Sequence, residues 1–330
     1  MIWLEFAVSA ILVVVAAIKL AECADAISLR TKLGGMFVGT LLLAGATSLP
    51  ELLTALSSIS QQVPELAAGS IFGSSMFNML LLAILDLVHP HTRILRTVAV
   101  NHALSAGIAV LLTTLAVFFL VADIGIKIGW VGLDSMILVG MYWLGMVLIF
   151  SKNRSLVPLD QATPESGAQV MGLIPSVIGF LGASIVLVLV TPWLVRSSVG
   201  ISEITGLSTG FIGAVLVAVV TSLPEVVTSV AATRMGAHDL AVGNLFGSNI
   251  FNIFALGSVD LFYFQGRFLA IVDPALILAG MAGLLLTSFG LVTTVAEVER
   301  RFLLVEVDAL LIILGYLGAM VLLFNRGILG

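Results

Sequence analysis

Two glutamates, Glu51 and Glu225, stand inside long apolar stretches of the chain, and each directly follows a proline. An ionised carboxylate at the centre of a membrane-spanning helix costs about 2.5–3.5 kcal/mol on insertion scales, so its presence there indicates a function. No lysine or arginine stands near the middle of the helices expected around the two glutamates. A mobile cation is therefore the expected counter-charge, and two carboxylates balance the charge of one Ca²⁺.

Neutral oxygen groups accompany each glutamate at helical spacing. A threonine and a serine precede each glutamate by four and three residues, so all three side chains share one face of a helix. The next helix in each case adds a serine and an asparagine four residues apart. These neutral groups are Thr47, Ser48, Ser74 and Asn78 in the first set and Thr221, Ser222, Ser248 and Asn252 in the second. Ca²⁺ takes about 6–8 oxygen ligands, whereas Mg²⁺ demands tight octahedral geometry, so the pattern favours Ca²⁺.

The prolines Pro50 and Pro224 predict a break in each glutamate-bearing helix. A proline lacks the backbone N–H and pushes against the carbonyl four residues earlier, here those of Ala46 and Val220. Inside a membrane, freed carbonyls are tolerated only where protein, water or an ion satisfies them. The breaks therefore point to a polar site between helices.

The elements that carry these residues occur twice in the chain. The segment Thr47–Glu51 recurs as Thr221–Glu225, an offset of 174 residues. The same offset relates Phe72-Gly73-Ser74 to Phe246-Gly247-Ser248, Asn78 to Asn252, Asp86 to Asp260 and Asp134 to Asp308. The matches fall on Pro, Gly, Glu, Asn and Asp, whereas chance similarity between apolar helices would match Leu and Val. We conclude that the chain is an internal duplication. The four aspartates are expected at helix ends, as interfacial or packing residues.

The composition is that of a membrane protein. The chain has 330 residues, of which 60% are hydrophobic and 10% charged, and its mean hydropathy is +1.20. Runs of about 20 apolar residues predict an all-α polytopic protein. The ten predicted spans are about 3–27, 34–59, 65–87, 98–121, 128–150, 171–195, 204–232, 239–262, 271–294 and 303–324. The net charge of −5 without a basic cluster argues against nucleic-acid binding, and the single Cys23 excludes an internal disulfide. No organic cofactor and no protein partner are predicted.

The polar stretch 151–170 divides the chain into one five-helix repeat at 1–150 and a second at 171–330. An odd number of helices per repeat places the second copy upside down, which is typical of secondary transporters with a site near the membrane midplane. With both termini outside, nine loop arginines and lysines lie in the cytoplasm (Arg30, Lys32, Arg93, Arg96, Lys152, Arg154, Arg234, Arg300 and Arg301) and four outside (Lys127, Arg196, Arg267 and Arg326). The positive-inside rule favours this orientation, in the plasma (inner) membrane.

The paired motifs resemble those of the calcium/cation antiporter superfamily. Its two α-repeats carry a helix of the type Gly-x-x-x-x-Ala-x-x-Thr-Ser-x-Pro-Glu, followed by a Gly-Asn-x-x-Gly-Ser helix. The resemblance covers residues 39–88 and 213–262, and the ten-helix layout extends it to the whole chain. It implies alternating access, in which the first and sixth helices slide across the other eight. It also implies that Glu51 and Glu225 bind Ca²⁺, that the eight neutral residues complete the Na⁺ and Ca²⁺ sites, and that the backbone carbonyls of Ala44 and Ala218 add Na⁺ ligands.

Departures from the family pattern bear on the coupling ion. K⁺-dependent members of the superfamily carry Asp at the position of Asn252, so this chain resembles the K⁺-independent sodium/calcium branch more closely. Proton/calcium exchangers more often show Gly-Asn-Ala-Thr-Glu or Gly-Asn-Ala-Ala-Glu in place of Thr-Ser-Leu-Pro-Glu. Exchange of Ca²⁺ for Na⁺ is therefore predicted, with H⁺/Ca²⁺ exchange as the alternative. An intramembrane enzyme lacks support because no nucleophile–base pair or zinc motif occurs, and a channel is less consistent with duplicated broken helices. In the first repeat Ser70 replaces the usual asparagine, present in the second as Asn244.

Overall fold

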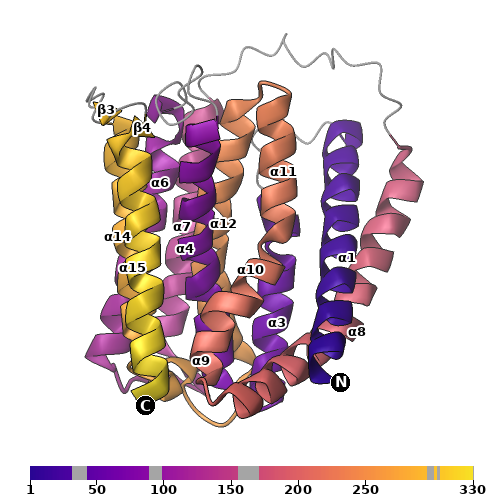
Figure 1. Ribbon diagram of the computed structural model, residues 1–330. Coiled ribbons are helices and arrows are strands. Elements are labelled where there is room, and N and C mark those ends of the chain that lie inside the picture. Colours follow the sequence, from indigo (N-terminus) through magenta and orange to yellow (C-terminus); the bar gives the residue numbers. More distant parts are fainter. Residues whose placement is uncertain (32–42, 89–98, 155–170, 296–300, 303–304, 330) are drawn as a thin grey trace.

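The computed structural model describes residues 1–31, 43–88, 99–154, 171–295, 301–302 and 305–329. They form a bundle of helices that run up and down between its two ends (Figure 1). The helices of the first half are α1 (Ile2–Thr31), α3 (Leu49–Ser60), α4 (Pro64–Val88), α6 (Ala99–Ala122) and α7 (Leu133–Arg154). Two-residue strands β1 (Lys127–Ile128) and β2 (Val131–Gly132) form a small hairpin before α7.

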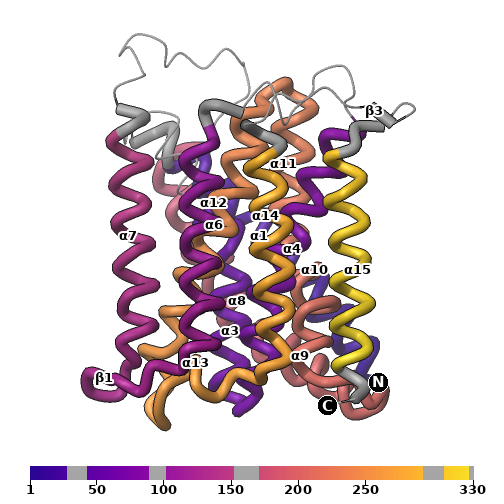
Figure 2. Tube along the Cα trace, turned by 90° about the vertical axis from the view of Figure 1, so that its left-hand side faces the viewer, coloured from indigo at the N-terminus to yellow at the C-terminus, as the bar shows by residue number. Residues whose placement is uncertain are grey.

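The second half begins with the long helix α8 (Leu173–Thr205) and continues through a series of shorter pieces. These are α9 (Thr209–Ile212), the π-helical turn η1 (Gly213–Val217), α10 (Ala218–Thr221), α11 (Leu223–Arg234), α12 (His238–Val259), the 3₁₀ turn η2 (Asp260–Phe262) and α13 (Phe268–Ile271). Helices α14 (Leu276–Val295) and α15 (Val307–Leu329) complete it, with the hairpin of β3 (Arg301–Phe302) and β4 (Val305–Glu306) between them. Figure 2 shows the first hairpin at the same end of the bundle as the two chain termini.

Seven helices of the described residues are long and apolar enough to cross a membrane. The pair Thr209–Thr221 and Leu223–Arg234, which meets at a bend of 42°, gives an eighth span if it is counted as one. The predicted ninth span corresponds to a shorter apolar helix, Leu276–Val292, and part of the predicted second span, 34–42, lies outside the described residues. The chain is therefore a mainly helical, polytopic membrane protein.

One predicted boundary was clearly wrong. Helix α8 continues to Thr205, whereas hydropathy placed its end at 195 and put Arg196 in a loop. Several polar residues beyond Val195 lower the hydropathy of this segment, but the hydroxyls of Ser197 and Ser198 donate to the carbonyl of Leu194 and are satisfied within the helix. The helix ends at Gly206, whose left-handed backbone (φ +72°) forms a C-cap with its N–H on the carbonyl of Ser202. Hydropathy measures only the apolar part of such a helix. The linker predicted at 151–170 lies outside the described residues from 155 onward.

The bundle contains two hydrophobic clusters. The larger joins α4, α6, α7, α12, α14 and α15, and its largest fully buried side chains include Phe72 and Phe246. The smaller is formed mainly by α1 and α8, with Leu20, Leu187 and Leu194 at its centre. Figure 1 shows α1 and α8 side by side at one edge of the molecule, on the far side from α14 and α15. The α1–α8 pair therefore packs as a unit against the remaining helices.

Helix α4 crosses the broken helix of the second half at backbone contact. A Cβ atom added at Gly69 would overlap the backbone of Gly210, and one added at Gly73 would overlap that of Ala214. Gly213 lies against Leu66 in the same way. Small residues let membrane helices approach this closely. The close crossing brings the polar face of α4 to the break between α10 and α11.

At the end of the bundle that holds the N-terminus, ionic bonds join the two halves. Arg267 donates to Asp123 (2.9 Å) and to the fully buried Asp134 (3.0 Å). Burial lowers the pKa of the Arg267 guanidinium, but the hydrogen bonds to Asp134 and Asp123 outweigh it, so the pKa is raised above its ordinary value. Asp260, also fully buried, accepts the backbone N–H groups of Gly132 and Phe268. Asp134 and Asp260 are therefore buried packing residues rather than interfacial ones.

Candidate ion-binding site

Both glutamate-bearing helices break at the serine that precedes Leu-Pro-Glu in each repeat. Ser48 (φ −91°, ψ 6°) and Ser222 (φ −88°, ψ 1°) leave helical geometry, and α3 and α11 begin directly after them. The predicted proline breaks are thus confirmed. In Figure 1, α3 continues to the end that holds the N-terminus, whereas α11 continues to the opposite end. Glu51 and Glu225 stand in the first turn of these helices, where the positive end of the helix dipole favours a carboxylate.

Each glutamate accepts hydrogen bonds from two serines, one from each half of the chain. Oε1 of Glu51 accepts from Ser222 Oγ (3.2 Å) and Ser74 Oγ (3.4 Å). Oε1 of Glu225 accepts from Ser48 Oγ (2.9 Å) and Ser248 Oγ (3.1 Å).

This pattern crosses between the halves, because Ser48 of the first motif serves the second glutamate and Ser222 of the second motif serves the first. Both carboxylates are buried, at 1% exposure for Glu51 and 0% for Glu225. The two motifs therefore form a single site.

Several oxygens of this site lack a donor. Within the described residues, Oε2 of Glu51, Oε2 of Glu225 and Oδ1 of both Asn78 and Asn252 are buried without a hydrogen-bond partner. A buried acceptor left unsatisfied costs about 1–3 kcal/mol, and more when it is charged. A cation bound by these oxygens removes that cost. The donor set is hard, anionic and neutral oxygen only, which suits Ca²⁺ and Na⁺.

The threonines and the alanine carbonyls lie beside the glutamates. Thr47 Oγ1 donates to the carbonyl of Ala44 (3.1 Å), and Thr221 Oγ1 donates to the carbonyl of Ala218 (3.3 Å). Ser74 Oγ also lies 3.4 Å from the Ala218 carbonyl.

All the residues predicted from the sequence for the site are buried: Ala44, Thr47, Ser48, Glu51, Ser74, Asn78, Ala218, Thr221, Ser222, Glu225, Ser248 and Asn252. Their role as ligands stays a prediction.

Sequence reasoning noted Asn244 as the counterpart of Ser70 but gave no role in the site to the asparagines and hydroxyls behind this set. Asn244 donates to Thr228 (3.0 Å) and Ser229 (3.2 Å) and lies 3.4 Å from the hydroxyl of Thr47. Asn249 contacts Asn78, and Ser75 contacts Asn252. The signal for them was the alignment of the two copies at the offset of 174 residues, in which Ser70 corresponds to Asn244 and Ser75 corresponds to Asn249. The two copies differ at these positions, whereas the duplication was recognised from positions at which the copies are identical.

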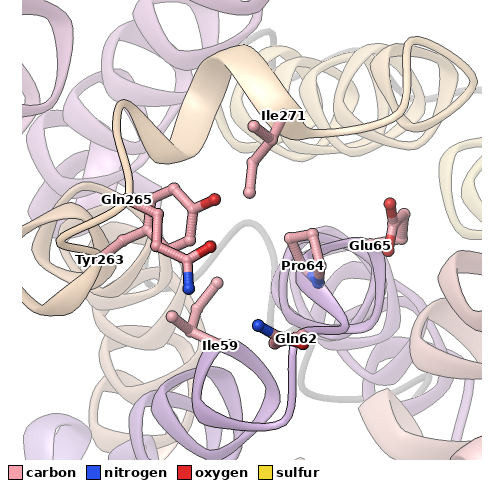
Figure 3. Close-up of a pocket in the computed structure, with 7 residues that line it drawn as sticks. All are labelled: Ile59, Gln62, Pro64, Glu65, Tyr263, Gln265 and Ile271. Carbon is pink, nitrogen blue, oxygen red and sulfur yellow. The ribbon is translucent and has the colours of Figure 1, made fainter.

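A cavity of about 320 Å³ opens elsewhere, between the α3–α4 turn and the chain that follows η2 (Figure 3). Its lining residues are Ile59, Gln62, Pro64, Glu65, Tyr263, Gln265 and Ile271. It contains a single carboxylate, that of Glu65, and none of the predicted ligands. Among the described residues, no group of three His, Cys, Asp or Glu side chains comes together. The buried glutamate pair is therefore the better candidate for a cation site.

Comparisons with known proteins agree with this architecture. The family profile of the sodium/calcium exchanger protein matches residues 1–151 and 175–325. The inner membrane protein YrbG of Escherichia coli is 28% identical over 256 residues, which cover 74% of this chain and 75% of YrbG. The sodium/calcium exchanger MaX1 of Methanosarcina acetivorans is 49% identical over 72 residues, which cover 22% of this chain and 21% of MaX1.

Two solved structures share the fold at low sequence identity. The H⁺/Ca²⁺ exchanger CAX superposes with a TM-score of 0.66 at 12% identity, covering 99% of this chain and 89% of that one. The sodium-calcium exchanger NCX_Mj gives a TM-score of 0.62 at 20% identity, covering 97% and 99%. Since the family profile spans nearly the whole chain and the fold agrees, this protein belongs to the sodium/calcium exchanger family, whose members are membrane antiporters of Ca²⁺ and a second cation.

Proposed function

We propose that this protein exchanges Ca²⁺ for Na⁺ by alternating access at the site formed by Glu51 and Glu225. The observation that carries the proposal is the pair of buried carboxylates, each with one oxygen held by serines of both halves and the other without a donor. Such a pair is costly in a membrane unless a cation occupies it. No organic cofactor is needed, because the transported ions are the only reactants.

The neutral oxygens favour Na⁺ as the coupling ion. Thr47 and Thr221 place hydroxyls and alanine carbonyls beside the carboxylates, and such groups help to hold a dehydrated Na⁺. Protonation of a carboxylate requires none of them. The similarity to MaX1 supports the same choice. The similarity in fold to CAX keeps H⁺/Ca²⁺ exchange as the second candidate.

Antiport follows if both ions need the same carboxylates. One ion must then leave before the other binds, and an empty site with two negative charges crosses between states unfavourably. The α1–α8 pair, whose two helices pack mainly against each other, is the element that we expect to slide across the remaining helices. The proposed arrangement has ten spans in two inverted repeats, 1–150 and 171–330, with both termini outside the inner membrane. It requires no protein partner.

Transport in proteoliposomes tests the coupling ion. Protein is reconstituted at equal pH on both sides, Na⁺ is loaded inside, and uptake of external Ca²⁺ is followed. We expect an outward Na⁺ gradient to drive Ca²⁺ uptake that survives a protonophore. Uptake that ignores Na⁺ but follows an imposed pH gradient would replace Na⁺ by H⁺ in the proposal.

A further inference from the structure

The side-chain amides of Asn78 and Asn252 are held in one orientation by residues that stand behind the site. Each amide carries a donor end and an acceptor end, and only the oxygen can bind a cation. In both residues Nδ2 is hydrogen-bonded to protein while Oδ1 is buried without a donor among the described residues. Asn78 and Asn252 lie one helical turn beyond Ser74 and Ser248, the serines that bind the glutamates.

For Asn252, the orientation follows from the polarity of Ser75. The hydroxyl of Ser75 donates its proton to the carbonyl of Ile71 (3.1 Å), which can only accept. Ser75 Oγ is then left as an acceptor, and it receives Nδ2 of Asn252 (3.2 Å). If the amide flipped, the Ser75 hydroxyl could donate to the Asn252 oxygen only by giving up its bond to the Ile71 carbonyl. The Asn252 oxygen therefore turns away from Ser75.

For Asn78, a longer relay gives the same result. Thr287 of α14 donates to the carbonyl of Gly283 (2.7 Å), so its oxygen accepts from Nδ2 of Asn249 (3.4 Å). The same Nδ2 lies 3.3 Å from the carbonyl of Ser75, a second group that can only accept. Oδ1 of Asn249 is thus fixed as the acceptor for Nδ2 of Asn78 (3.0 Å). The relay starts from backbone carbonyls, so its direction cannot reverse.

We propose that Ser75 and Asn249 are positioning residues that turn the carbonyl oxygens of Asn252 and Asn78 toward the transported cation. This inference rests on the proposed function and adds to it a second layer of residues. If either amide flipped, an N–H group with partial positive charge would face the cation in place of an oxygen. Partners of this kind behind a metal ligand typically change metal affinity by about 10–100-fold.

The relay is built differently in the two halves. The offset of 174 residues pairs Ser75 with Asn249, and each orients the asparagine of the other half. Ser75 works with one hydroxyl and its own helix, whereas Asn249 also reaches Thr287 in α14. All three side chains are buried, at 1–2% exposure. The orientation of both amides is thus tied to the contact between α4 and α12.

A double-mutant cycle tests the role of Ser75. Ca²⁺ binding to purified protein in detergent is titrated at fixed pH for the wild type, Ser75→Ala, Asn252→Asp and the double variant. Ser75→Ala should raise the half-saturating Ca²⁺ concentration by about tenfold. In the Asn252→Asp background, Ser75→Ala should change the half-saturating Ca²⁺ concentration by less than about twofold, because a carboxylate presents an oxygen in either orientation. Ser75→Thr keeps the hydroxyl and should bind like the wild type.

The same cycle applies to Asn249→Ala in the Asn78 and Asn78→Asp backgrounds. Thr113→Val is the matched control, since Thr113 is equally buried in α6 and, among the residues that the structure describes, its hydroxyl bonds only the carbonyl of Ala109 (2.8 Å). Folding of each variant is checked by size-exclusion chromatography and thermal unfolding. An equal loss of affinity in both backgrounds, or unchanged affinity in folded Ser75→Ala, would overturn the relay while leaving the proposed function intact. A wild type that binds no Ca²⁺ would overturn both.

Discussion

The two halves of the molecule hold their glutamates in the same way, but the residues that surround their threonines differ. Glu51 and Glu225 are bound symmetrically, each by one serine from α3–α4 and one from the α10–α12 region. The surroundings of the threonines differ. Thr47 lies against Asn244 of the other half, whereas Thr221 lies 3.4 Å from Ser74.

The difference arises from two substitutions between the copies, Ser70 in place of Asn244 and Ala55 in place of Ser229. Asn244 spans from α12 to Thr228 and Ser229 of α11. Its counterpart Ser70 is too short to do so and bonds the carbonyl of Ala67 in its own helix. Thr54, the counterpart of Thr228, is buried without a hydrogen-bond partner among the described residues, whereas Thr228 also donates to the carbonyls of Pro224 and Glu225 in its own helix. The two copies thus share the carboxylates and the neutral groups beside them, and they differ in the residues behind these groups.

The largest loss of Ca²⁺ exchange is expected from substitutions of the two glutamates, which both halves bind alike. Glu51→Gln and Glu225→Gln each remove one of two charges, so Ca²⁺ exchange by either variant should fall to the level of empty liposomes. Glu203→Gln is the matched control, because Glu203 is exposed near the end of α8. Near-normal exchange by one glutamine variant but not the other would break the symmetry; near-normal exchange by both would remove the glutamates from the site.

A second contrast concerns helix packing. Gly73 and Gly247 occupy equivalent positions in the two copies. A Cβ at Gly73 would overlap the backbone of Ala214, whereas a Cβ at Gly247 would meet, among the described residues, only the side chain of Ala44, at 3.0 Å. Gly73→Ala should therefore destabilise the protein by about 1–3 kcal/mol or more, and Gly247→Ala by less. Thermal unfolding of the purified variants measures this. Equal stability of the two would mean that α4 and α12 pack alike.

The smallest effect is expected from the asymmetric contact. Asn244→Ser gives the second half the residue of the first and removes the bond to Thr228 and the contact with Thr47. We expect a change of about threefold in half-saturating Ca²⁺ or Na⁺, with exchange retained, as for the loss of a neutral hydrogen bond. Ser70→Ala serves as the comparison and should leave both values unchanged. An equal effect of the two variants would show that the halves are equivalent here.

Much of this arrangement was predictable because the residues that indicate it, glutamate and proline, are energetically unfavourable inside a membrane helix. Glu51 and Pro50, with their copies at 225 and 224, are unfavourable inside a membrane helix unless they have a function, so they predicted both the helix breaks and the candidate site. Burial of every predicted site residue agrees with that prediction. The true end of α8 was not predictable from hydropathy, because Ser197 and Ser198 satisfy themselves within the helix.

The residues behind the site were harder to predict. Ser75 and Asn249 look like ordinary polar residues of a membrane helix, and their partners lie on other helices. Their importance depends on which end of an amide faces which acceptor, and that is a property of the packed helices. The bond between Arg267 and Asp134 is of the same kind, since 133 residues separate the two. Spacing within one helix carries no information about such contacts.

The central claim is that Ca²⁺ and Na⁺ compete for one pair of carboxylates. Calorimetric titration of the purified protein with Ca²⁺, at fixed pH and ionic strength and with Na⁺ raised stepwise in place of a large organic cation, tests it most directly. The account predicts that the apparent dissociation constant for Ca²⁺ rises steadily with Na⁺ while the number of sites stays the same. Ca²⁺ binding that is indifferent to Na⁺ at every concentration would contradict it.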